Sequence, residues 1–209
     1  MLVEDHPVIR SGLNLLIGGT SEFRVVAETG ASREVLTLAR QHRPEVVLLD
    51  LMLDGADGLL LIKEIVGVVP DCRVLVFSML SESVFAERAL RAGAVGYLMK
   101  SAPEEEFLLA LRNVRDRRVY LSPRIFVSVF RGALSRGSSA AGVSALSDRE
   151  LHVFQLIGAG VRNKEIAQAL GISVKTVESH RENIKSKLSL HDGVELGVAA
   201  LKFVESLRG

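Results

Sequence analysis

Polar side chains that could carry out phosphoryl chemistry stand directly after short apolar runs in the first half of the chain. Glu4 and Asp5 follow the first run, Asp50 follows "VVLL", and Ser78 and Lys100 follow two later runs. Carboxylates bind Mg²⁺, which completes its shell with water and phosphate oxygens. A lysine supplies a point charge for phosphate, and a hydroxyl can donate to an added anion. An aspartate in this company can act as a nucleophile toward phosphorus, although taken alone Asp50 could also be a helix cap or a turn acid.

The elements that must bring these side chains together follow from the hydrophobic pattern. Five β-type runs alternate with helical stretches, which predicts an α/β fold with a five-stranded, doubly wound parallel sheet. Ligands of such sheets bind beyond the carboxyl ends of the strands. The first strand looks short because only three residues precede Glu4, so either the chain starts late or a few strand residues are missing. The expected strands are 2–3, 23–28, 46–49, 73–77 and 95–98, and the expected helices lie near 7–17, 32–43, 57–67, 82–92 and 103–116.

The second half has a different character. The stretch "RGALSRGSSAAGVSAL" (131–146) is rich in Gly, Ser and Ala and predicts a linker. Only helical patterns follow it, near 147–159, 163–170, 174–188 and 193–207. We therefore expect a first domain at 1–120, a linker at 121–143 and a small all-α domain at 144–209.

Composition narrows the class of protein. The chain has 209 residues, 48% of them hydrophobic, and a single cysteine, Cys72. Neither a membrane-spanning run nor a secretory leader is apparent, which favours a cytoplasmic protein without membrane contact. The net charge of +1 does not by itself identify a nucleic-acid binder.

Four stretches of the first domain resemble the receiver domain of bacterial two-component response regulators. They are "VEDHPVIRSGL", "VVLLDLMLDGADGL", "VLVFSML" and "AGAVGYLMK", in the family's order and spacing. The resemblance implies that Asp50 is the phosphoacceptor and that Lys100 pairs with the phosphoryl group. It further implies that Ser78 is the switch hydroxyl and Tyr97 the aromatic residue that follows it inward. The implied Mg²⁺ ligands are Glu4, Asp5, Asp50 and the backbone carbonyl of Met52.

Departures and rival interpretations concern the loop after Asp50. Many receivers carry proline at the fourth position after the phosphoacceptor, where this chain has Asp54. An aspartyl-phosphate phosphatase needs a second Asp two residues after the nucleophile, and Met52 occupies that position. The chain is therefore not expected to be a turnover enzyme. His6 has no second histidine placed to join it and is interpreted as a solvated loop residue.

The stretch "VRNKEIAQALGISVKTVESHRENIKSKL" (161–188) has the layout of two helices around a tight turn. Gly171 stands where the chain must reverse, and Ser173 can cap the second helix. Val177, Ile184 and Leu188 form a buried stripe along that helix. An ordinary αα-hairpin with a solvated face would look the same on these grounds.

The longer stretch 146–190 is similar to the LuxR-type DNA-binding domain. This resemblance puts base-reading positions at Glu178, Ser179 and Glu182. The final helix carries Val194, Val198, Leu201 and Val204 along one side, which suits packing within the domain or a dimer surface. Further contacts to the DNA backbone, or structural roles, fall to Lys164, Lys175, Thr176, His180, Arg181, Lys185 and Lys187.

The pairing of the two domains resembles the NarL/FixJ class of response regulators. It implies a DNA-binding transcriptional regulator that a sensor histidine kinase switches by phosphorylating Asp50, with Mg²⁺ as cofactor. The implied partners are promoter DNA, a second copy of the chain in a phosphorylated homodimer, and RNA polymerase. Two alternatives stay open: a phosphorylation-independent DNA-binding regulator with an atypical receiver, and a phosphorelay intermediate whose helical domain binds protein.

Overall fold

The computed structural model describes residues 1–53, 57–123, 125–127 and 143–206. The chain divides into two compact units, Met1–Leu134 (the N-terminal unit) and Ser135–Gly209 (the C-terminal unit). Asp54 and most of the predicted linker lie outside the described residues. Among the helices that are described, none has the length and apolar character needed to cross a membrane.

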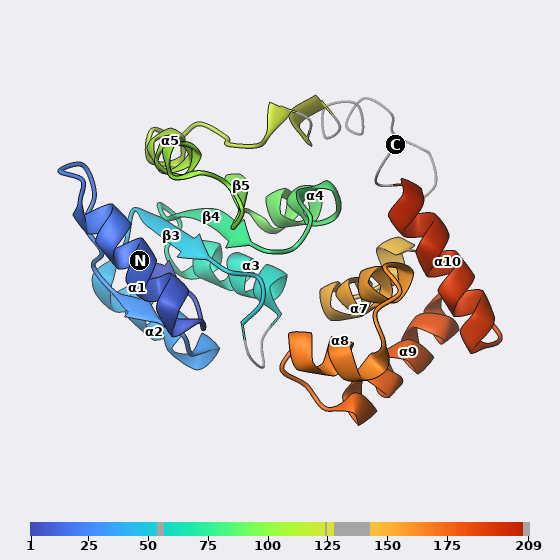
Figure 1. The fold of residues 1–209 in the computed structure, drawn as a ribbon. Helices are drawn as coiled ribbons and strands as arrows, with labels where there is room; N and C mark the ends of the chain where they lie inside the picture. The colour runs from blue at the N-terminus through green and yellow to red at the C-terminus, as the bar shows by residue number, and fades with distance from the viewer. Residues whose placement is uncertain (54–56, 124, 128–142, 207–209) are drawn as a thin grey trace. The chain divides into compact units, whose positions relative to one another are not determined.

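A parallel sheet of five short strands forms the centre of the N-terminal unit (Figure 1). The strands are β1 (Leu2–Val3), β2 (Glu28–Thr29), β3 (Val46–Leu49), β4 (Arg73–Ser78) and β5 (Gly96–Met99). Their order is β2-β1-β3-β4-β5, and every neighbouring pair is parallel. The predicted doubly wound sheet is confirmed, and its carboxyl edge collects the residues that follow β1, β3, β4 and β5.

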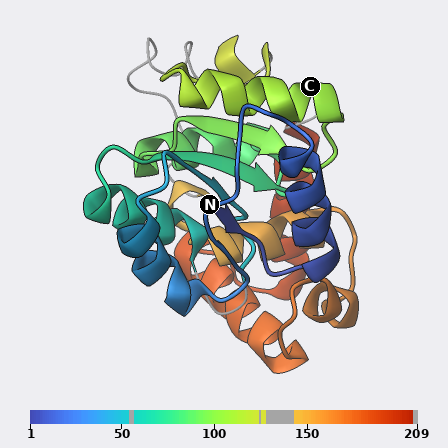
Figure 2. The same cartoon turned by 90° about the vertical axis from the view of Figure 1, so that its left-hand side faces the viewer.

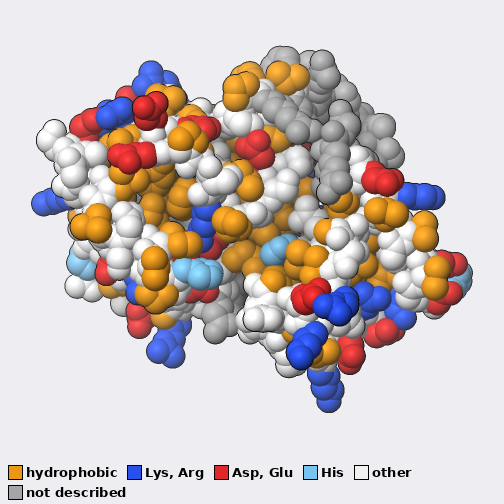
Figure 3. Space-filling view, viewed as in Figure 1, with side chains coloured by type: hydrophobic (Ala, Val, Ile, Leu, Met, Phe, Trp, Pro, Cys, Tyr) orange, Lys and Arg blue, Asp and Glu red, His pale blue; other side chains and the backbone are white. Residues whose placement is uncertain are grey.

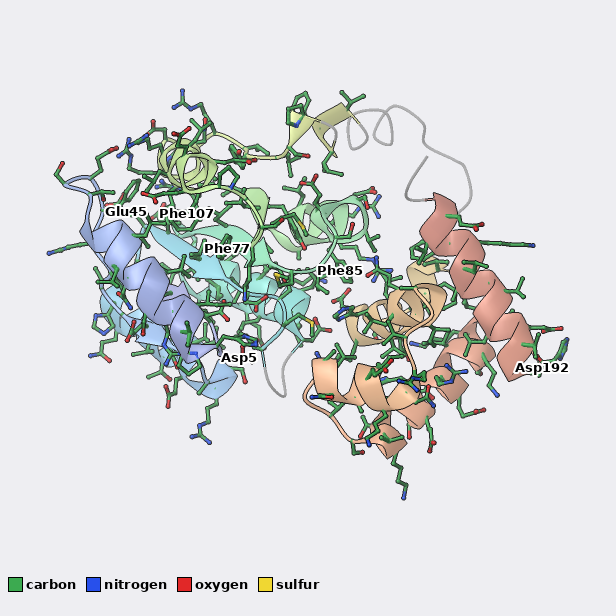
Figure 4. The ribbon with its side chains drawn as sticks, viewed as in Figure 1. Asp5, Glu45, Phe77, Phe85, Phe107 and Asp192 are labelled. Carbon is green, nitrogen blue, oxygen red and sulfur yellow. The ribbon has the colours of Figure 1, made fainter. Side chains whose placement is uncertain are left out.

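Five helices cover the two faces of this sheet. They are α1 (Pro7–Gly18), α2 (Ser32–His42), α3 (Gly58–Val68), α4 (Glu82–Ala92) and α5 (Glu104–Arg115). Helices α1 and α5 lie on one face, and α2, α3 and α4 on the other (Figures 1 and 2). On the first face, Phe77 of β4 and Phe107 of α5 meet edge-on, with ring centroids 5.3 Å apart (Figure 4). Phe85 of α4 is fully buried on the second face. Each such ring contributes about 1.5–3 kcal/mol of burial energy.

The second strand is shorter than its sequence predicts. A strand was expected over 23–28, whereas only Glu28 and Thr29 pair with β1. Phe23 and Val25 are half-buried against the apolar core, so their hydrophobic pattern reflects packing and not ladder pairing. The ladder ends here because β1 offers only two residues to pair with.

Helices alone make up the described part of the C-terminal unit. They are the short 3-10 helix η1 (Val143–Ala145) and the α-helices α7 (Asp148–Gly158), α8 (Asn163–Ala169), α9 (Val174–Leu188) and α10 (Gly193–Ser206). The last helix begins at a cap formed by Asp192, which accepts from two backbone N–H groups at 2.8 Å (Figure 4). It crosses α7 so closely that a Cβ on Gly158 would collide with the carbonyl oxygen of Ala200. Phe154 and Phe203 stack across this crossing, 5.5 Å apart.

Candidate functional site

Glu4, Asp50 and Lys100 meet at the carboxyl edge of the sheet, where the strand ends were predicted to bring them together. Lys100 Nζ lies 2.5 Å from Glu4 Oε2 and 2.7 Å from Asp50 Oδ2. The three side chains are only 2–4% exposed. Two buried carboxylates repel each other unless a cation lies between them. Lys100 is therefore the internal counter-ion of Glu4 and Asp50, a role beyond the phosphate contact expected from the sequence.

Asp50 receives hydrogen bonds at both carboxylate oxygens. Its Oδ1 accepts from Ser78 Oγ at 2.8 Å and from the backbone N–H of Met52 at 3.0 Å, while Oδ2 faces Lys100. The helix that follows is capped by Asp57, whose side chain accepts from two N–H groups in the first turn of α3. Asp50 is thus not a helix cap, and it projects into the cluster formed by the strand ends.

Tyr97 is joined to Ser78 through the peptide groups of Leu80. The phenol donates to the carbonyl oxygen of Leu80 at 2.9 Å, and the N–H of Leu80 donates to Ser78 Oγ at 3.4 Å. Burial, followed by the nearby charges of Asp50 and Glu82, raises the pKa of Tyr97 well above its ordinary value. In this structure the ring of Tyr97 is fully buried inside the N-terminal unit.

Asp5 and His6 extend the cluster toward solvent. His6 Nδ1 lies 3.0 Å from Glu4 Oε1 and 2.8 Å from Asp5 Oδ1, and one donor atom each of Glu4, Asp5, His6 and Asp50 lies within 4.8 Å of the others. The side chain of Asp5 is 23% exposed, so water can complete a metal shell. Three carboxylates in a partly hydrated site fit Mg²⁺. His6 is 63% exposed, as a loop residue should be, yet its ring nitrogen lies against both acids.

Arg10 holds the loop that carries Glu4 and Asp5, a contact that the sequence analysis does not predict. Its Nη1 donates to the carbonyl oxygen of Glu4 at 2.6 Å. A Cβ on Gly30 would lie 3.0 Å from that nitrogen and 3.1 Å from Asp5 Cα, so a larger residue there would press on both groups. A single arginine in the first helix gives no sequence signal for such a contact.

Helices α8 and α9 form the predicted helix-turn-helix in the C-terminal unit. Gly171 lies in the turn with φ of +63°, a conformation that favours glycine. Ser173 Oγ accepts from the N–H of Thr176 at 3.0 Å and caps α9. Val177 and Ile184 are fully buried, which confirms most of the predicted stripe.

The residues predicted to contact DNA differ in how far they reach solvent. Most are exposed on α8 and α9, and some are half-buried against the unit. Exposed are Lys164, Lys175, Glu178, Ser179, Glu182 and Lys187, and half-buried are Thr176, His180, Arg181 and Lys185.

Lys187 is bound within the unit. Its Nζ lies 2.6 Å from Oε2 of Glu150, which also accepts from the N–H of Ser147 at 2.8 Å. Burial opposes ionisation of Glu150, but the hydrogen bonds from Lys187 and Ser147 outweigh it and lower its pKa. The ion pair with Glu150 favours a structural role for Lys187. Burial separately lowers the pKa of the His180 imidazole.

Charges of both signs lie intermixed over α8 and α9 (Figure 3). Lys185 Nζ is 2.9 Å from Glu182 Oε2, and Arg162 pairs with Glu165. The surface is thus not uniformly basic, so charge alone does not distinguish a DNA-binding pair from an ordinary hairpin.

The last helix leaves a row of apolar side chains exposed. Leu196 and Ala200 are fully buried, whereas Val194, Val198 and Leu201 are 74%, 47% and 48% exposed. Their spacings of four and three place them on one helix face. This row is an apolar surface on the C-terminal unit.

Two families of known proteins match this architecture. Residues 1–112 match the response regulator receiver domain, and residues 144–200 match the bacterial regulatory proteins of the luxR family. The chain is 34% identical over 209 residues to the oxygen regulatory protein NreC of Staphylococcus epidermidis, covering 97% of this chain and 96% of the relative. NreC of Staphylococcus aureus is 34% identical over 208 residues, with the same coverage.

Solved structures show the same likeness. A LuxR-family two-component response regulator from Aurantimonas sp. is 34% identical with a TM-score of 0.59, over 65% of this chain and 96% of the other. The response regulator ChrA of a heme-sensing two-component system is 29% identical with a TM-score of 0.50, over 99% and 96%. RcsB of Salmonella enterica, bound to the promoter P1flhDC in the presence of a phosphomimetic, is 23% identical with a TM-score of 0.61 over 98% and 96%, which shows the shared fold alone.

Proposed function

The chain belongs to the response regulators of the NarL/FixJ class, in which a receiver domain precedes a LuxR-type DNA-binding domain, and on that premise we propose that Asp50 is its phosphoacceptor. It is a response regulator and a regulator of transcription. The observation that carries the proposal is the buried meeting of Asp50 with Lys100 and Ser78. The proposed domain limits are 1–120 and 144–209, with a linker at 121–143.

In the proposed reaction, a carboxylate oxygen of Asp50 attacks the phosphorus of a phosphohistidine on a sensor kinase. The N–P bond breaks as the O–P bond forms, and the histidine nitrogen takes up a proton. Lys100 lies within reach of the new phosphoryl oxygens, and Ser78 can donate to one of them. No turnover of a separate substrate follows, so the chain is proposed not to be an enzyme.

Glu4, Asp5, Asp50 and the carbonyl of Met52 are the proposed holders of Mg²⁺. The chemistry that the ion supplies when bound is neutralisation of the negative charge on phosphoryl oxygens. Arg10 contributes by holding the carbonyl of Glu4, which fixes the loop that carries the acid pair. A bound cation would also take over part of the neutralisation of Glu4 that Lys100 now provides, leaving the lysine free to turn to the phosphoryl group.

The proposed output is DNA binding by α9 in a homodimer. Lys175, Glu178, Ser179 and Glu182 are exposed along one helix and available to a major groove. The apolar row on α10 supports a second copy of the chain as partner. RNA polymerase at the promoter and a cytoplasmic location complete the proposal, and the RcsB structures with promoter DNA are a precedent in a relative of the same fold.

Phosphorylation is tested by incubating the protein with Mg²⁺ and acetyl phosphate and measuring its intact mass. We expect one added phosphoryl group on the wild type and none on Asp50→Asn. Asp71→Asn is the matched control, because Asp71 is an exposed carboxylate of the same unit, outside the cluster. An adduct that persists in Asp50→Asn would contradict the assignment of the phosphoacceptor.

DNA binding is tested by fluorescence anisotropy with promoter fragments at several salt concentrations. Lys175→Ala should weaken binding and reduce the salt slope by about one unit, whereas Lys202→Ala on α10 should not. Acetyl phosphate should tighten binding by the wild type and leave Asp50→Asn unchanged. Tight binding that ignores phosphorylation would favour the phosphorylation-independent regulator instead.

A further inference from the structure

The first turn of α7 contacts the helix-turn-helix of the C-terminal unit at two places, through two neighbouring residues. Arg149 Nη2 donates to the carbonyl oxygen of Leu170 at 2.7 Å. Leu170 is the C-cap of α8, so this bond holds the chain immediately before the turn that leads into α9. Glu150 Oε2 lies 2.6 Å from Nζ of Lys187, in the last turn of α9. Two residues of α7 thus hold the start of the turn and the far end of α9.

The face of α9 that packs against α7 carries a row of inward side chains (Figure 1). Val177 and Ile184 are fully buried in this row. His180 and Lys187 each follow one of them at a spacing of three, which places all four on the same side of the helix. Burial lowers the pKa of the His180 imidazole, the charge of the α7 glutamate opposes this, and that of the α7 arginine adds to it. His180 therefore lies near both residues of α7.

The residues proposed to face DNA lie on the opposite side of α9. Lys175, Glu178 and Glu182 are exposed and follow one another at spacings of three and four. Because the helix turns as one body, the position of the inward row determines where this outward row points. Side-chain tips lie about 5–6 Å from a helix axis, so a rotation of about 20° displaces them by about 2 Å. A displacement of that size breaks a hydrogen bond to a base edge.

The two contacts from α7 are directional, whereas the apolar contacts of α9 are not. Hydrophobic burial has no preferred direction, so Val177 and Ile184 define the rotation of the helix only loosely. The carboxylate of Glu150 is 4% exposed and also accepts from the N–H of Ser147 at 2.8 Å, which fixes it on α7. A charged group held in this way accepts the ammonium of Lys187 in a narrow range of positions.

We propose that Arg149 and Glu150 are positioning residues for DNA recognition, which fix the rotation of α9 about its axis and so direct its outward row at the base edges. The inference rests on the proposed DNA binding by α9 and goes beyond it, because it assigns sequence discrimination to two residues of a neighbouring helix. Lys187 acts in this arrangement as the partner of Glu150 and not as a phosphate contact.

The test compares the affinity of the full-length protein for two DNA duplexes. One duplex of about 30 base pairs, long enough for two half-sites, is enriched from a random pool on the wild type with Mg²⁺ and acetyl phosphate. The other has the same bases in shuffled order. Fluorescence anisotropy gives a Kd for each duplex, and the ratio of the two Kd values measures sequence discrimination. Salt slopes are recorded on the shuffled duplex.

Glu150→Gln removes the charge that holds Lys187, but its side chain can still accept from the N–H of Ser147 and keep the capping of α7. It should lower the discrimination ratio about tenfold, as the loss of one base contact would. Glu165→Gln is the matched control, because it removes the same charge from an exposed ion pair with Arg162 at the start of α8. The control should keep the wild-type ratio, and the two variants should have equal affinity and salt slope on the shuffled duplex.

A second variant and a measurement without DNA complete the test. Arg149→Met removes the bond to the carbonyl of Leu170 and should lower the ratio in the same way. Residual dipolar couplings of backbone N–H groups report the orientation of α9 relative to α7. They should show a reorientation of about 10–20° in Glu150→Gln and none in Glu165→Gln. Calorimetry identifies an assay temperature at which every variant is folded.

Three outcomes would overturn the inference. The first is a folded Glu150→Gln protein that keeps either the ratio or the dipolar couplings of the wild type. The second is an equal loss of affinity for both duplexes, which would show a general structural role. The third is a steeper salt slope in Glu150→Gln than in Glu165→Gln, because the freed Lys187 would then contact phosphate. A wild type that enriches no sequence would instead overturn the proposed function, and the dipolar couplings would still decide whether the two residues position α9.

Discussion

Replacing Lys100 by methionine should destabilise the N-terminal unit and make its stability depend on Mg²⁺. The ammonium lies 2.5 Å from Glu4 and 2.7 Å from Asp50, and all three side chains are at most 4% exposed. Lys100→Met keeps most of the aliphatic length but removes the charge, so two buried carboxylates lose their shared cation. Removing one partner of a buried ion pair costs about 3–5 kcal/mol.

Part of that cost is offset by contacts that remain. Asp50 keeps its hydrogen bonds from Ser78 and from the N–H of Met52, whereas among the described residues Glu4 keeps only the N–H of His6 and its ring. We therefore expect a loss of about 3 kcal/mol, or roughly 10 °C in Tm for a unit of this size. A cation that enters the cluster no longer competes with the ammonium. At a Mg²⁺ concentration of ten times Kd, binding to the folded state restores about 1.4 kcal/mol.

The assay is thermal and urea unfolding of the full chain in EDTA and in Mg²⁺. Lys63→Ala is the control, because Lys63 is an exposed lysine of α3 in the same unit. Mg²⁺ should raise the stability of Lys100→Met more than that of the wild type. A Lys100→Met protein that unfolds in EDTA together with the control would refute the role of Lys100 as internal counter-ion. Equal Mg²⁺ effects on both proteins would refute the competition between the ion and the lysine.

Three further predictions concern other parts of the chain. Burial lowers the pKa of the Met1 amine from 8.0 to about 6, so between these two pH values the unfolded chain binds more protons than the folded chain. The free energy of unfolding, measured by urea titration, should therefore rise by up to about 3 kcal/mol as the pH increases across this range. Acetylation of the N-terminal amine should remove this part of the pH dependence. Ser173→Ala removes the cap of α9 and should cost the C-terminal unit about 1 kcal/mol in calorimetry, whereas exposed Ser179→Ala should cost under about 0.5 kcal/mol; equal losses would contradict the capping role. Burial raises the pKa of the Cys72 thiol to about 11, so a disulfide reagent should label the native chain slowly and the urea-unfolded chain quickly, and rapid native labelling would contradict this environment.

The meeting of Glu4, Asp50 and Lys100 could be predicted because parallel strands end at one edge of a sheet. Each residue follows an apolar run, so locating the runs locates the cluster. Which acid the lysine contacts could not be predicted, since that depends on side-chain reach across two strands. The contact of Arg10 could not be predicted either, because it is made to a backbone carbonyl, and every residue type has one.

In the C-terminal unit, the features that depend on residues close in sequence could be predicted, and the contact between distant residues could not. The turn glycine at 171, the cap at Ser173 and the buried stripe of α9 all follow from neighbours within one or two helical turns. The bond between Lys187 and Glu150 spans 37 positions and has no periodic signal.

In the N-terminal unit, the length of β2 was predicted wrongly, because apolar residues at 23 and 25 pack against the core without pairing in the ladder.

The backbone of Leu80 connects the acid cluster to the buried Tyr97 through hydrogen bonds. Its N–H contacts Ser78 Oγ and its carbonyl accepts from Tyr97, while Ser78 donates to Asp50. Ser78 has a single hydroxyl proton, so donating it to a phosphoryl oxygen on Asp50 means giving up the present bond to the carboxylate. Such a reorientation changes what the N–H of Leu80 can contact. A shift of Leu80 would then move its carbonyl, which belongs to the next peptide group and accepts from the phenol of Tyr97. Tyr97→Phe should therefore leave phosphorylation of Asp50 intact while weakening its effect on DNA affinity, whereas a parallel loss of phosphorylation would show that the tyrosine serves the cluster itself.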